Sequence, residues 1–249
     1  SLHDALPISV DEQRVRVVLL AGPVAGAGHA IDVGEAIRQA AFGGGCSALV
    51  HLATMPGGAA EADPEGARRV NVDAMFDMLS AAAKSGSRPR VVFASSIAVL
   101  GDPLPAAGVD DATPLAPRMI YGAHKAMMEV ALATLSRRGE VDGVSLRLPG
   151  ILARPKGPSG MKSAFMSDLF HALRAGERFV CPVSEAATIW AQSVSCCAEN
   201  ILHALDANAT KLPEARALTL PDVGLFADGT AVKLVGEETF RITRELVDD

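Results

Sequence analysis

Four short apolar runs, each followed by a segment with helical spacing, constrain the fold of this chain more than any other feature. The runs are 15–21 (VRVVLLA), 47–54 (SALVHLAT), 90–96 (RVVFASS) and 143–149 (GVSLRLP). Continuous apolar runs of this length are typical of strands that are buried on both faces of a parallel sheet. Strands that alternate with helices form right-handed βαβ units, so the sequence predicts an α/β fold with a doubly wound parallel sheet.

The segments with helical spacing are 32–42, 64–86, 121–138, 160–176 and 193–205. The second of them carries one apolar stripe, made of Val70, Met75, Met78, Leu79 and Ala82. A stripe of this kind faces the core, and the following Gly86 is a stop signal. In a parallel α/β sheet, ligands bind at the carboxyl ends of the strands. We therefore expect a functional site where the runs 47–54, 90–96 and 143–149 end.

The composition narrows the class of protein. Of the 249 residues, 49% are hydrophobic, which is enough to form a core. No apolar run approaches the roughly 18 residues that a membrane span needs. The net charge of −6, with acids and bases interspersed, argues against nucleic acid as a partner. The four cysteines lack metal-ligand spacing, so we expect no metal site, reduced thiols and a cytoplasmic location.

The first nine residues, SLHDALPIS, show neither apolar periodicity nor a starting methionine. They can be back-translated into the end of a common sequencing adapter. We therefore interpret 1–9 as translated adapter, joined to a gene fragment that lacks its 5′ end. The alternative is an ordinary frayed terminus, and native codons for this stretch at the genomic locus would establish it.

A serine, a tyrosine and a lysine are the candidates for chemistry. Ser96 ends the third run, and Tyr121, the only tyrosine of the chain, opens a helix after a proline-rich loop. Residues i and i+4 share one face of a helix, so we expect Lys125 beside Tyr121. An ammonium group beside a phenol lowers the phenol's pKa from about 10, which would make Tyr121 a general base for an alcohol. Ser96 is expected to hydrogen-bond the same substrate oxygen.

The segments 94–101 (ASSIAVLG), 121–125 (YGAHK) and 147–151 (RLPGI) together resemble the extended short-chain dehydrogenase/reductase family of NAD-dependent epimerases and dehydratases. The resemblance runs from about residue 32 to about residue 205. It implies a Rossmann-type sheet, NAD as cofactor and a dehydrogenase that oxidises a small sugar acid. It also implies a partial NAD(P)-binding domain at 10–150 and a C-terminal substrate-binding region at 151–249.

The resemblance assigns roles to individual residues. Tyr121 is the base, Ser96 orients the substrate, and Lys125 tunes the tyrosine and binds the ribose hydroxyls of the cofactor. Asn71 matches a catalytic and cofactor-binding asparagine on the family's central helix, and the alternative is that it caps or bridges backbone in the crevice of the sheet. The other cofactor residues are Asp32 and Val33 at the adenine, Leu52 and Ala53 at the adenosine ribose, and Pro149, Gly150 and Ile151 at the nicotinamide carboxamide. The substrate residues are Ser96, Tyr121, Arg154, Lys162 and Trp190.

Two departures from the family pattern affect the expected activity. The family begins with a strand and a G-x-x-G-x-x-G loop that holds the cofactor's pyrophosphate at a helix N-terminus, whereas Gly22, Gly26 and Gly28 have a different spacing. We interpret the first strand and the loop as missing, and expect this chain to bind NAD poorly and to expose a strand edge. Thr188 stands just before Trp190, where relatives carry arginine.

Two alternatives to a sugar-acid dehydrogenase remain open. The same Ser/Tyr/Lys set serves nucleotide-sugar epimerases and dehydratases, and an inactive Rossmann fragment could bind only a cofactor or a partner. The resemblance also implies a homodimer, with Met75, Met78 and Met128 at the contact between two subunits. His51 is interpreted either as a buried histidine with satisfied hydrogen bonds or as a cofactor neighbour, and His124 as solvated helix surface.

Overall fold

The computed structural model describes residues 8–9, 16–20, 47–106, 108–152, 164–184, 187 and 189–220, and it describes 8–9 and 16–20 by their backbone alone. The chain forms two compact units. The first consists of Ser1–Arg147 and Ile201–Thr219, and the second of Leu148–Asn200 and Leu220–Asp249. Residues 201–219 therefore return to the first unit after the chain has passed through the second.

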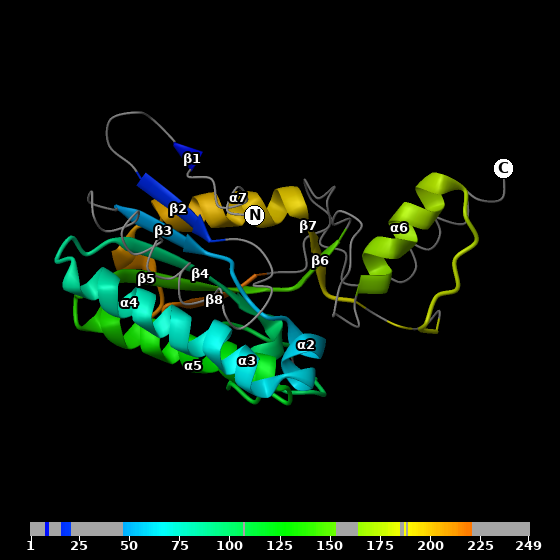
Figure 1. The fold of residues 1–249 in the computed structure, drawn as a ribbon, viewed down its shortest axis with the longest axis horizontal. Coiled ribbons are helices and arrows are strands. Elements are labelled where there is room, and N and C mark those ends of the chain that lie inside the picture. Colours follow the sequence, from blue (N-terminus) through cyan, green and yellow to red (C-terminus); the bar gives the residue numbers. More distant parts are fainter. Residues whose placement is uncertain are drawn as a thin grey trace. The chain divides into compact units, whose positions relative to one another are not determined.

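A six-stranded sheet forms the centre of the first unit (Figure 1). Its strands, in their order across the sheet, are β1 (Ile8–Ser9), β2 (Arg16–Leu20), β3 (Ala48–His51), β4 (Arg90–Ser96), β5 (Asp142–Leu148) and β8 (Ala217–Thr219). The pairs β2–β3, β3–β4 and β5–β8 are parallel, and β1 is antiparallel to β2. The prediction of an α/β fold with a parallel sheet is confirmed.

β2 lies beside β3, with Val17 opposite Ala48 and Leu20 opposite His51. β3 is therefore paired on both sides, with β2 and with β4. Because pairing removes the open row of N–H and C=O groups that defines a strand edge, the expectation of an exposed edge is wrong for β3. The glycines at 22, 26 and 28 lie outside the described residues.

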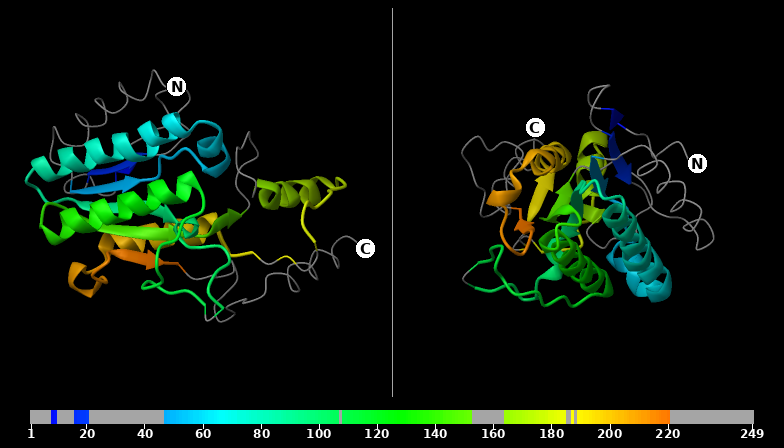
Figure 2. Two further views of the ribbon diagram at one scale, coloured as in Figure 1. Left: turned by 90° about the horizontal axis from the view of Figure 1, so that it is seen from below. Right: turned by 90° about the vertical axis from the view of Figure 1, so that its left-hand side faces the viewer.

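Helices cover both faces of the sheet (Figure 1, Figure 2). α4 (Ala74–Lys84) and α5 (Ile120–Arg137) pack on one face, and the second half of α7 (Val194–Asp206) lies on the other. Arg90 anchors this second half, because its guanidinium donates to the carbonyl oxygens of Ala204 at 2.9 Å and Ala207 at 2.6 Å. Coverage of both faces is the physical reason why the strands of the sheet are continuously apolar.

The segment 64–86, which the sequence predicts as one helix, consists of three helical pieces. α3 (Pro64–Arg68) leads into a π-helical turn, Arg69–Asp73, and α4 follows directly. The short helix α2 (Gly57–Ala62) precedes them, and the Asp63 carboxylate caps α3 by accepting from the Gly66 N–H at 2.9 Å. π-helical turns are frequent at functional sites, and this one carries Asn71.

The core of the first unit is formed where α4 and α5 pack against the sheet. Its buried members are Leu49, Met75, Met78, Leu79, Ala82, Val91, Phe93, Met128, Leu132 and Val141. The expectation that Met75, Met78 and Met128 form a contact between subunits is therefore wrong, because the core accounts for their burial. The exposed large apolar side chains of α4 and α5 are Phe76, Met127 and Val130.

The second unit buries fewer large apolar side chains in the part that the structure describes. β6 (Gly150–Leu152) and β7 (Ala191–Ser193) form a parallel pair with Gly150 opposite Ala191. α6 (Phe165–Ala175) ends at Gly176, whose φ of 65° is the left-handed conformation that favours glycine at a helix end. Within the described ranges of both units, no helix has the length and apolar character that crossing a membrane requires.

Candidate active site

Ser96 lies at the carboxyl end of β4, and its side chain starts the next turn. Its backbone is extended, and its hydroxyl oxygen accepts a hydrogen bond from the Ala98 N–H at 3.1 Å. The chain then forms a 3-10 turn, Ile97–Val99. A side chain that caps a turn in this way has a fixed position. The Ser96 hydroxyl is therefore held at the sheet end where ligands bind in such folds.

Gly122 brings the start of α5 into direct contact with this turn. A Cβ atom at position 122 would lie 2.1 Å from the Ala98 carbonyl oxygen and 3.1 Å from a side-chain atom of Pro117. Only glycine fits this approach without moving backbone. Tyr121, the preceding residue, forms a hydrogen bond with the Ser96 side chain. Gly122 was not among the residues predicted from the sequence, although a glycine in the first turn of an otherwise strong helix is a usable signal.

Lys125 lies one turn further along α5 and is almost completely buried. Its Nζ donates to the Ala94 carbonyl oxygen at 2.7 Å. The ammonium group also lies 4.6 Å from the centre of the Phe93 ring and 5.6 Å from the centre of the Tyr121 ring. These distances allow cation–π attraction to both rings. The structure thus brings together Ser96, Tyr121 and Lys125, as the spacing in the sequence predicts.

The pKa values of this group differ from the sequence-based expectation. Burial raises the pKa of Tyr121 above its ordinary value, and the hydrogen bond with Ser96 offsets part of the rise. Burial also lowers the pKa of Lys125 from 10.5 to about 7, and the charge of Glu129 opposes this fall. The predicted lowering of the tyrosine pKa is therefore wrong here. The cation that should cause it loses part of its charge near neutral pH and donates to a carbonyl group instead.

Asn71 uses its side chain to fix the segment that follows β3. Its Oδ1 accepts from the Met55 N–H at 2.7 Å and from the Thr54 hydroxyl at 3.0 Å, and its Nδ2 donates to the Met55 carbonyl oxygen at 2.9 Å. Leu52 and Ala53, the expected ribose contacts, lie half-buried in this segment. These contacts support a positioning role for Asn71 toward the segment 52–55.

Two buried histidines lie near the site. The Nδ1 atoms of His51 and His124 are buried and have no hydrogen-bond partner among the described residues. Burial and the nearby Lys125 charge lower the pKa of His51 to about 3, so its ring is neutral. Burial also lowers the pKa of His124. The interpretation of His124 as solvated surface is wrong, because the residue is buried, with an exposed fraction of 9%.

The expected nicotinamide and substrate residues of the second unit lie close to one another. The Gly150 N–H donates to the Trp190 carbonyl oxygen at 3.0 Å, next to buried Pro149 and half-buried Ile151. The Trp190 indole N–H donates to the Leu220 carbonyl oxygen at 3.1 Å. The structure therefore joins Pro149–Ile151 and Trp190 in one unit. Other expected site residues lie outside the described ranges, namely Asp32, Val33, Arg154, Lys162 and Thr188.

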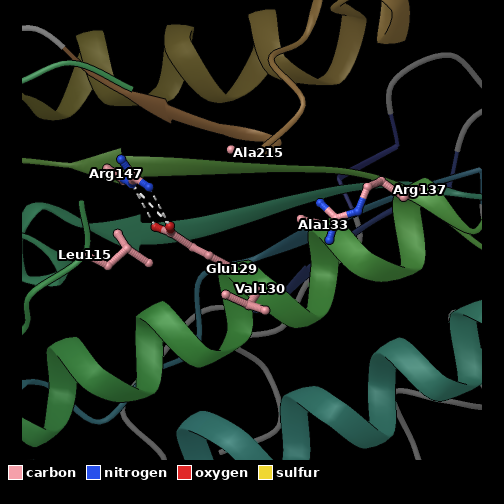
Figure 3. Close-up of a pocket in the computed structure, with 7 residues that line it drawn as sticks. All are labelled: Leu115, Glu129, Val130, Ala133, Arg137, Arg147 and Ala215. Carbon is pink, nitrogen blue, oxygen red and sulfur yellow. Dashed lines mark hydrogen bonds and ion pairs between the residues drawn. The ribbon is translucent and has the colours of Figure 1, made fainter. Parts of the chain in front are cut away.

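A buried ion pair joins Glu129, one turn beyond Lys125 on α5, to Arg147 of β5 (Figure 3). Neither residue was predicted from the sequence. Glu129 and Arg147 line a pocket of about 190 Å³ in the first unit, with Leu115, Val130, Ala133, Arg137 and Ala215. The side chains of Glu129 and Arg147 are at most 4% exposed, and Arg147 Nη2 lies 3.0 Å from Glu129 Oε2. An arginine inside the apolar run 143–149 was the available signal, because a buried charge needs a partner. Within the described ranges, no cluster of three or more His, Cys, Asp or Glu could hold a metal.

The model of the NAD dependent epimerase/dehydratase family matches residues 9–192. D-erythronate dehydrogenase of Cupriavidus necator is 35% identical over 223 residues, which cover 90% of this chain and 65% of the relative. D-erythronate dehydrogenase of Haemophilus influenzae is 36% identical over 174 residues, which cover 70% of this chain and 55% of the relative. The chain thus spans less than two thirds of the length of both proteins.

One solved structure that resembles this chain is named as an epimerase and not as a dehydrogenase. The crystal structure of the nucleoside-diphosphate-sugar epimerase from Agrobacterium tumefaciens matches with a TM-score of 0.69 and 31% identity, over 87% of this chain and 62% of that one. A stretch of 42 residues, 17% of this chain, is also 60% identical to 8% of the L-threonine dehydratase biosynthetic IlvA of Burkholderia multivorans. That stretch is too short to show a second family.

Proposed function

The chain belongs to the NAD-dependent epimerase/dehydratase family, and we propose that it acts as a dehydrogenase that oxidises a small sugar acid, D-erythronate, to its 2-oxo acid. Membership of the family implies a nicotinamide cofactor, which we propose to be NAD. The substrate is proposed from the two D-erythronate dehydrogenases, which are 35% and 36% identical to this chain.

The arrangement of Ser96, Tyr121 and Lys125 is the observation that carries this proposal. The Ser96 and Tyr121 side chains meet at the end of β4, where Ser96 lowers the tyrosine pKa as a hydrogen-bonding group, and the Lys125 ammonium lies above the tyrosine ring. A substrate hydroxyl that replaces the serine–tyrosine hydrogen bond would contact both oxygens. Ser96 then orients the alcohol, and Tyr121 takes its proton as the general base.

The raised pKa of Tyr121 sets a condition on this step. A buried phenolate is stable only where a positive charge compensates it, and Lys125 is the cation nearest to the ring among the described residues. Tyr121 must first lose its own proton to solvent, which a charged Lys125 favours, and the phenolate then takes the proton of the alcohol. When bound, NAD would accept the hydride from the carbon atom that bears this hydroxyl, so the alcohol loses one proton and one hydride and becomes a carbonyl group.

The described residues fit a nicotinamide cofactor at the carboxyl ends of the strands. Lys125 carries donors for ribose hydroxyls, and Asn71 fixes the segment of Leu52 and Ala53 from one side. The buried and unpartnered Nδ1 of His51 lies at the end of β3, where a polar ligand group would satisfy it. In the second unit, Pro149–Ile151 is proposed to contact the carboxamide, while Trp190, Arg154 and Lys162 are proposed to contact the substrate.

A second candidate function is a nucleotide-sugar epimerase, which the 31% identity to the Agrobacterium tumefaciens protein favours. An epimerase would use the same Ser/Tyr/Lys set and return the hydride to its substrate, so no reduced cofactor would accumulate. The third possibility is a chain that binds cofactor or a partner without turnover. We also propose a homodimer through α4 and α5, where Phe76, Met127 and Val130 are exposed, and activity in the cytoplasm. A monomer by light scattering at micromolar concentration would contradict the dimer.

Absorbance at the NADH band tests the three functions when NAD is mixed with D-erythronate or with UDP-glucose. We expect NADH to accumulate with D-erythronate alone in a protein that carries the family's pyrophosphate-binding loop, whereas residues 1–249 are expected to bind NAD poorly. In Tyr121→Phe, the rate should fall by about 10²–10⁴-fold because the ring stays but the ionisable hydroxyl is lost. Ser96→Ala should also lose activity, and its matched control Ser87→Ala, at an exposed loop, should not. Epimerised UDP-glucose without NADH would favour the epimerase, and NAD binding without any turnover would favour the inactive binder.

A further inference from the structure

We propose that Glu129 is a positioning residue for Lys125, because its buried carboxylate fixes α5 to β4 and β5 and keeps the lysine in its charged form. The catalytic meaning of this inference rests on the proposed function, in which Tyr121 requires a charged Lys125. The state of Lys125 itself can be measured without any turnover.

Both carboxylate oxygens of Glu129 are occupied by neighbours from two strands. Oε1 accepts from the Ser95 hydroxyl of β4 at 2.5 Å, and Arg147 of β5 donates to Oε1 and Oε2 at 3.0–3.2 Å through Nε and Nη2. Figure 3 shows the two charged side chains reaching toward each other from α5 and β5. Charge-assisted bonds with fork geometry define direction as well as distance. They fix the rotation of α5 about its axis, and with it the direction in which Tyr121 and Lys125 project.

The network also reaches the residue beside Ser96. The hydrogen bond of Ser95 holds β4 against α5, and Ser96, the next residue, caps the turn that follows the strand. Arg147 is held further by the Asp111 carbonyl oxygen and the Thr219 hydroxyl, both at 3.3 Å. Glu129 thus connects α5 to an already anchored arginine.

Glu129 and Lys125 are four residues apart on one helix, which places them on the same face. The other titratable groups that face Lys125 among the described residues are His51 from β3 and Tyr121 from α5, while β4 contributes the Ala94 carbonyl and the Phe93 ring. His51 is neutral above a pKa of about 3, and Tyr121 is neutral because its pKa is raised. Glu129 is therefore the negative charge on this part of the molecule that favours the ammonium.

Burial and the Glu129 charge act in opposite directions on the pKa of Lys125. With Glu129 present, burial already brings the lysine pKa down to about 7, close to the pH at which the protein would work. Removing the carboxylate charge leaves burial unopposed, so the pKa falls further and the lysine becomes neutral at pH 7. A glutamine retains an acceptor oxygen for Ser95 and Arg147, which separates the effect of the charge from the effect of the contacts.

A titration of Lys125 by NMR, with ¹³Cε-labelled lysine in the full chain, tests the inference. The Lys125 signal is assigned as the one that disappears in Lys125→Arg. We expect a midpoint near 7 for the unsubstituted chain, and a fall of about one pH unit or more in Glu129→Gln. Ser95→Ala removes a hydrogen bond but no charge, and Glu65→Gln removes an exposed charge on α3. Both controls should leave the midpoint within about 0.3 units, since neither changes the charge near Lys125.

Two results would overturn the inference: an unchanged midpoint in Glu129→Gln, or an equal fall in Ser95→Ala. If Glu129→Gln does not fold, the double variant Glu129→Gln/Arg147→Met removes both charges of the pair, a change that buried pairs often tolerate, and its Lys125 midpoint should be lower than that of Arg147→Met alone, which keeps the carboxylate charge. Because the titration involves neither cofactor nor substrate, it can succeed while the dehydrogenase proposal fails. If both hold, the pH above which the rate of NADH formation declines should move down with the Lys125 midpoint.

Discussion

The two compact units bury different kinds of side chain. In the first unit, the large fully buried side chains include Phe93, Leu49, Met75, Leu79 and Leu132. In the described part of the second unit, the large side chain that is buried to the same degree is that of polar Gln192. The buried apolar residues there are Ala172, Ala191 and Leu220. Val180 of the second unit is 80% exposed. One unit therefore has a core of large apolar side chains, whereas the described part of the other buries fewer of them.

This difference matches the roles that we propose for the two units. Proton transfer between Ser96, Tyr121 and Lys125 requires fixed distances, and a close-packed core transmits little movement. Contacts with a substrate can come from a less stable region, because binding elements are often drawn from the low-stability end of a fold. A two-stranded sheet such as β6–β7 is marginally stable by itself. We therefore expect substitutions to have unequal effects in the two units.

Truncating one aliphatic side chain in each unit is the strongest test of this difference. Leu79→Ala leaves a cavity in the core, so the free energy of unfolding should fall by about 2–5 kcal/mol. Val180→Ala removes exposed methyl groups and should change it by less than about 0.5 kcal/mol. Urea unfolding followed by circular dichroism measures both. A loss above about 1 kcal/mol in Val180→Ala would mean that another part of the protein covers Val180, and the contrast between the units would no longer hold.

The elements that depend on local pattern could be predicted from the sequence. β3, β4 and β5 follow continuous apolar runs, and α5 follows strong helical spacing. The meeting of Ser96 and Tyr121 follows from the rule that parallel strands gather their carboxyl ends on one side. Gly122 adds what the pattern did not specify, namely the close approach of α5 to the turn at Ala98. The sequence was therefore informative where periodicity and topology decide the structure.

The features that depend on tertiary packing could not be predicted. Burial of His124, the neutral state of His51 and the raised pKa of Tyr121 all depend on desolvation by distant segments. The methionine stripe shows the same limit, since the period identifies an apolar face but not whether a sheet or a second subunit covers it. The Glu129–Arg147 pair joins residues 18 apart, and no local rule connects them.

Acid pH should lower the stability of the first unit, because the buried neutral His51 lies there. Its pKa is about 3 in the folded chain and 6.5 when exposed, so the unfolded chain binds more protons below pH 6.5. The contribution of His51 to stability is complete above 6.5 and falls by about 1.4 kcal/mol for each pH unit below it, or about 2 kcal/mol at pH 5. His124, whose pKa is also lowered, acts in the same direction.

Urea unfolding at pH 7 and pH 5 measures this loss in the unsubstituted chain, in His51→Gln and in His203→Gln. We expect His51→Gln to lose clearly less stability between the two pH values, since glutamine does not titrate. His203 is exposed on α7 and serves as the control, which should lose as much as the unsubstituted chain. Equal losses in all three proteins would show that His51 is already accessible to protons, and the first unit would then be less closed than its core indicates.

Trp190 offers the most sensitive comparison, because the only tryptophan of the chain lies in the second unit. Its fluorescence reports the surroundings of β7 and Leu220, whereas circular dichroism is dominated by helices such as α4 and α5 of the first unit. If the second unit is less stable by about 1–2 kcal/mol, its transition should lie about 0.5–1 M lower in urea. Trp190→Phe removes one hydrogen bond, worth about 0.5–1.5 kcal/mol, and should leave the dichroism transition unchanged because the core of the first unit is intact. Coincident transitions by both probes would contradict the contrast, since they would mean that the chain unfolds as one cooperative body.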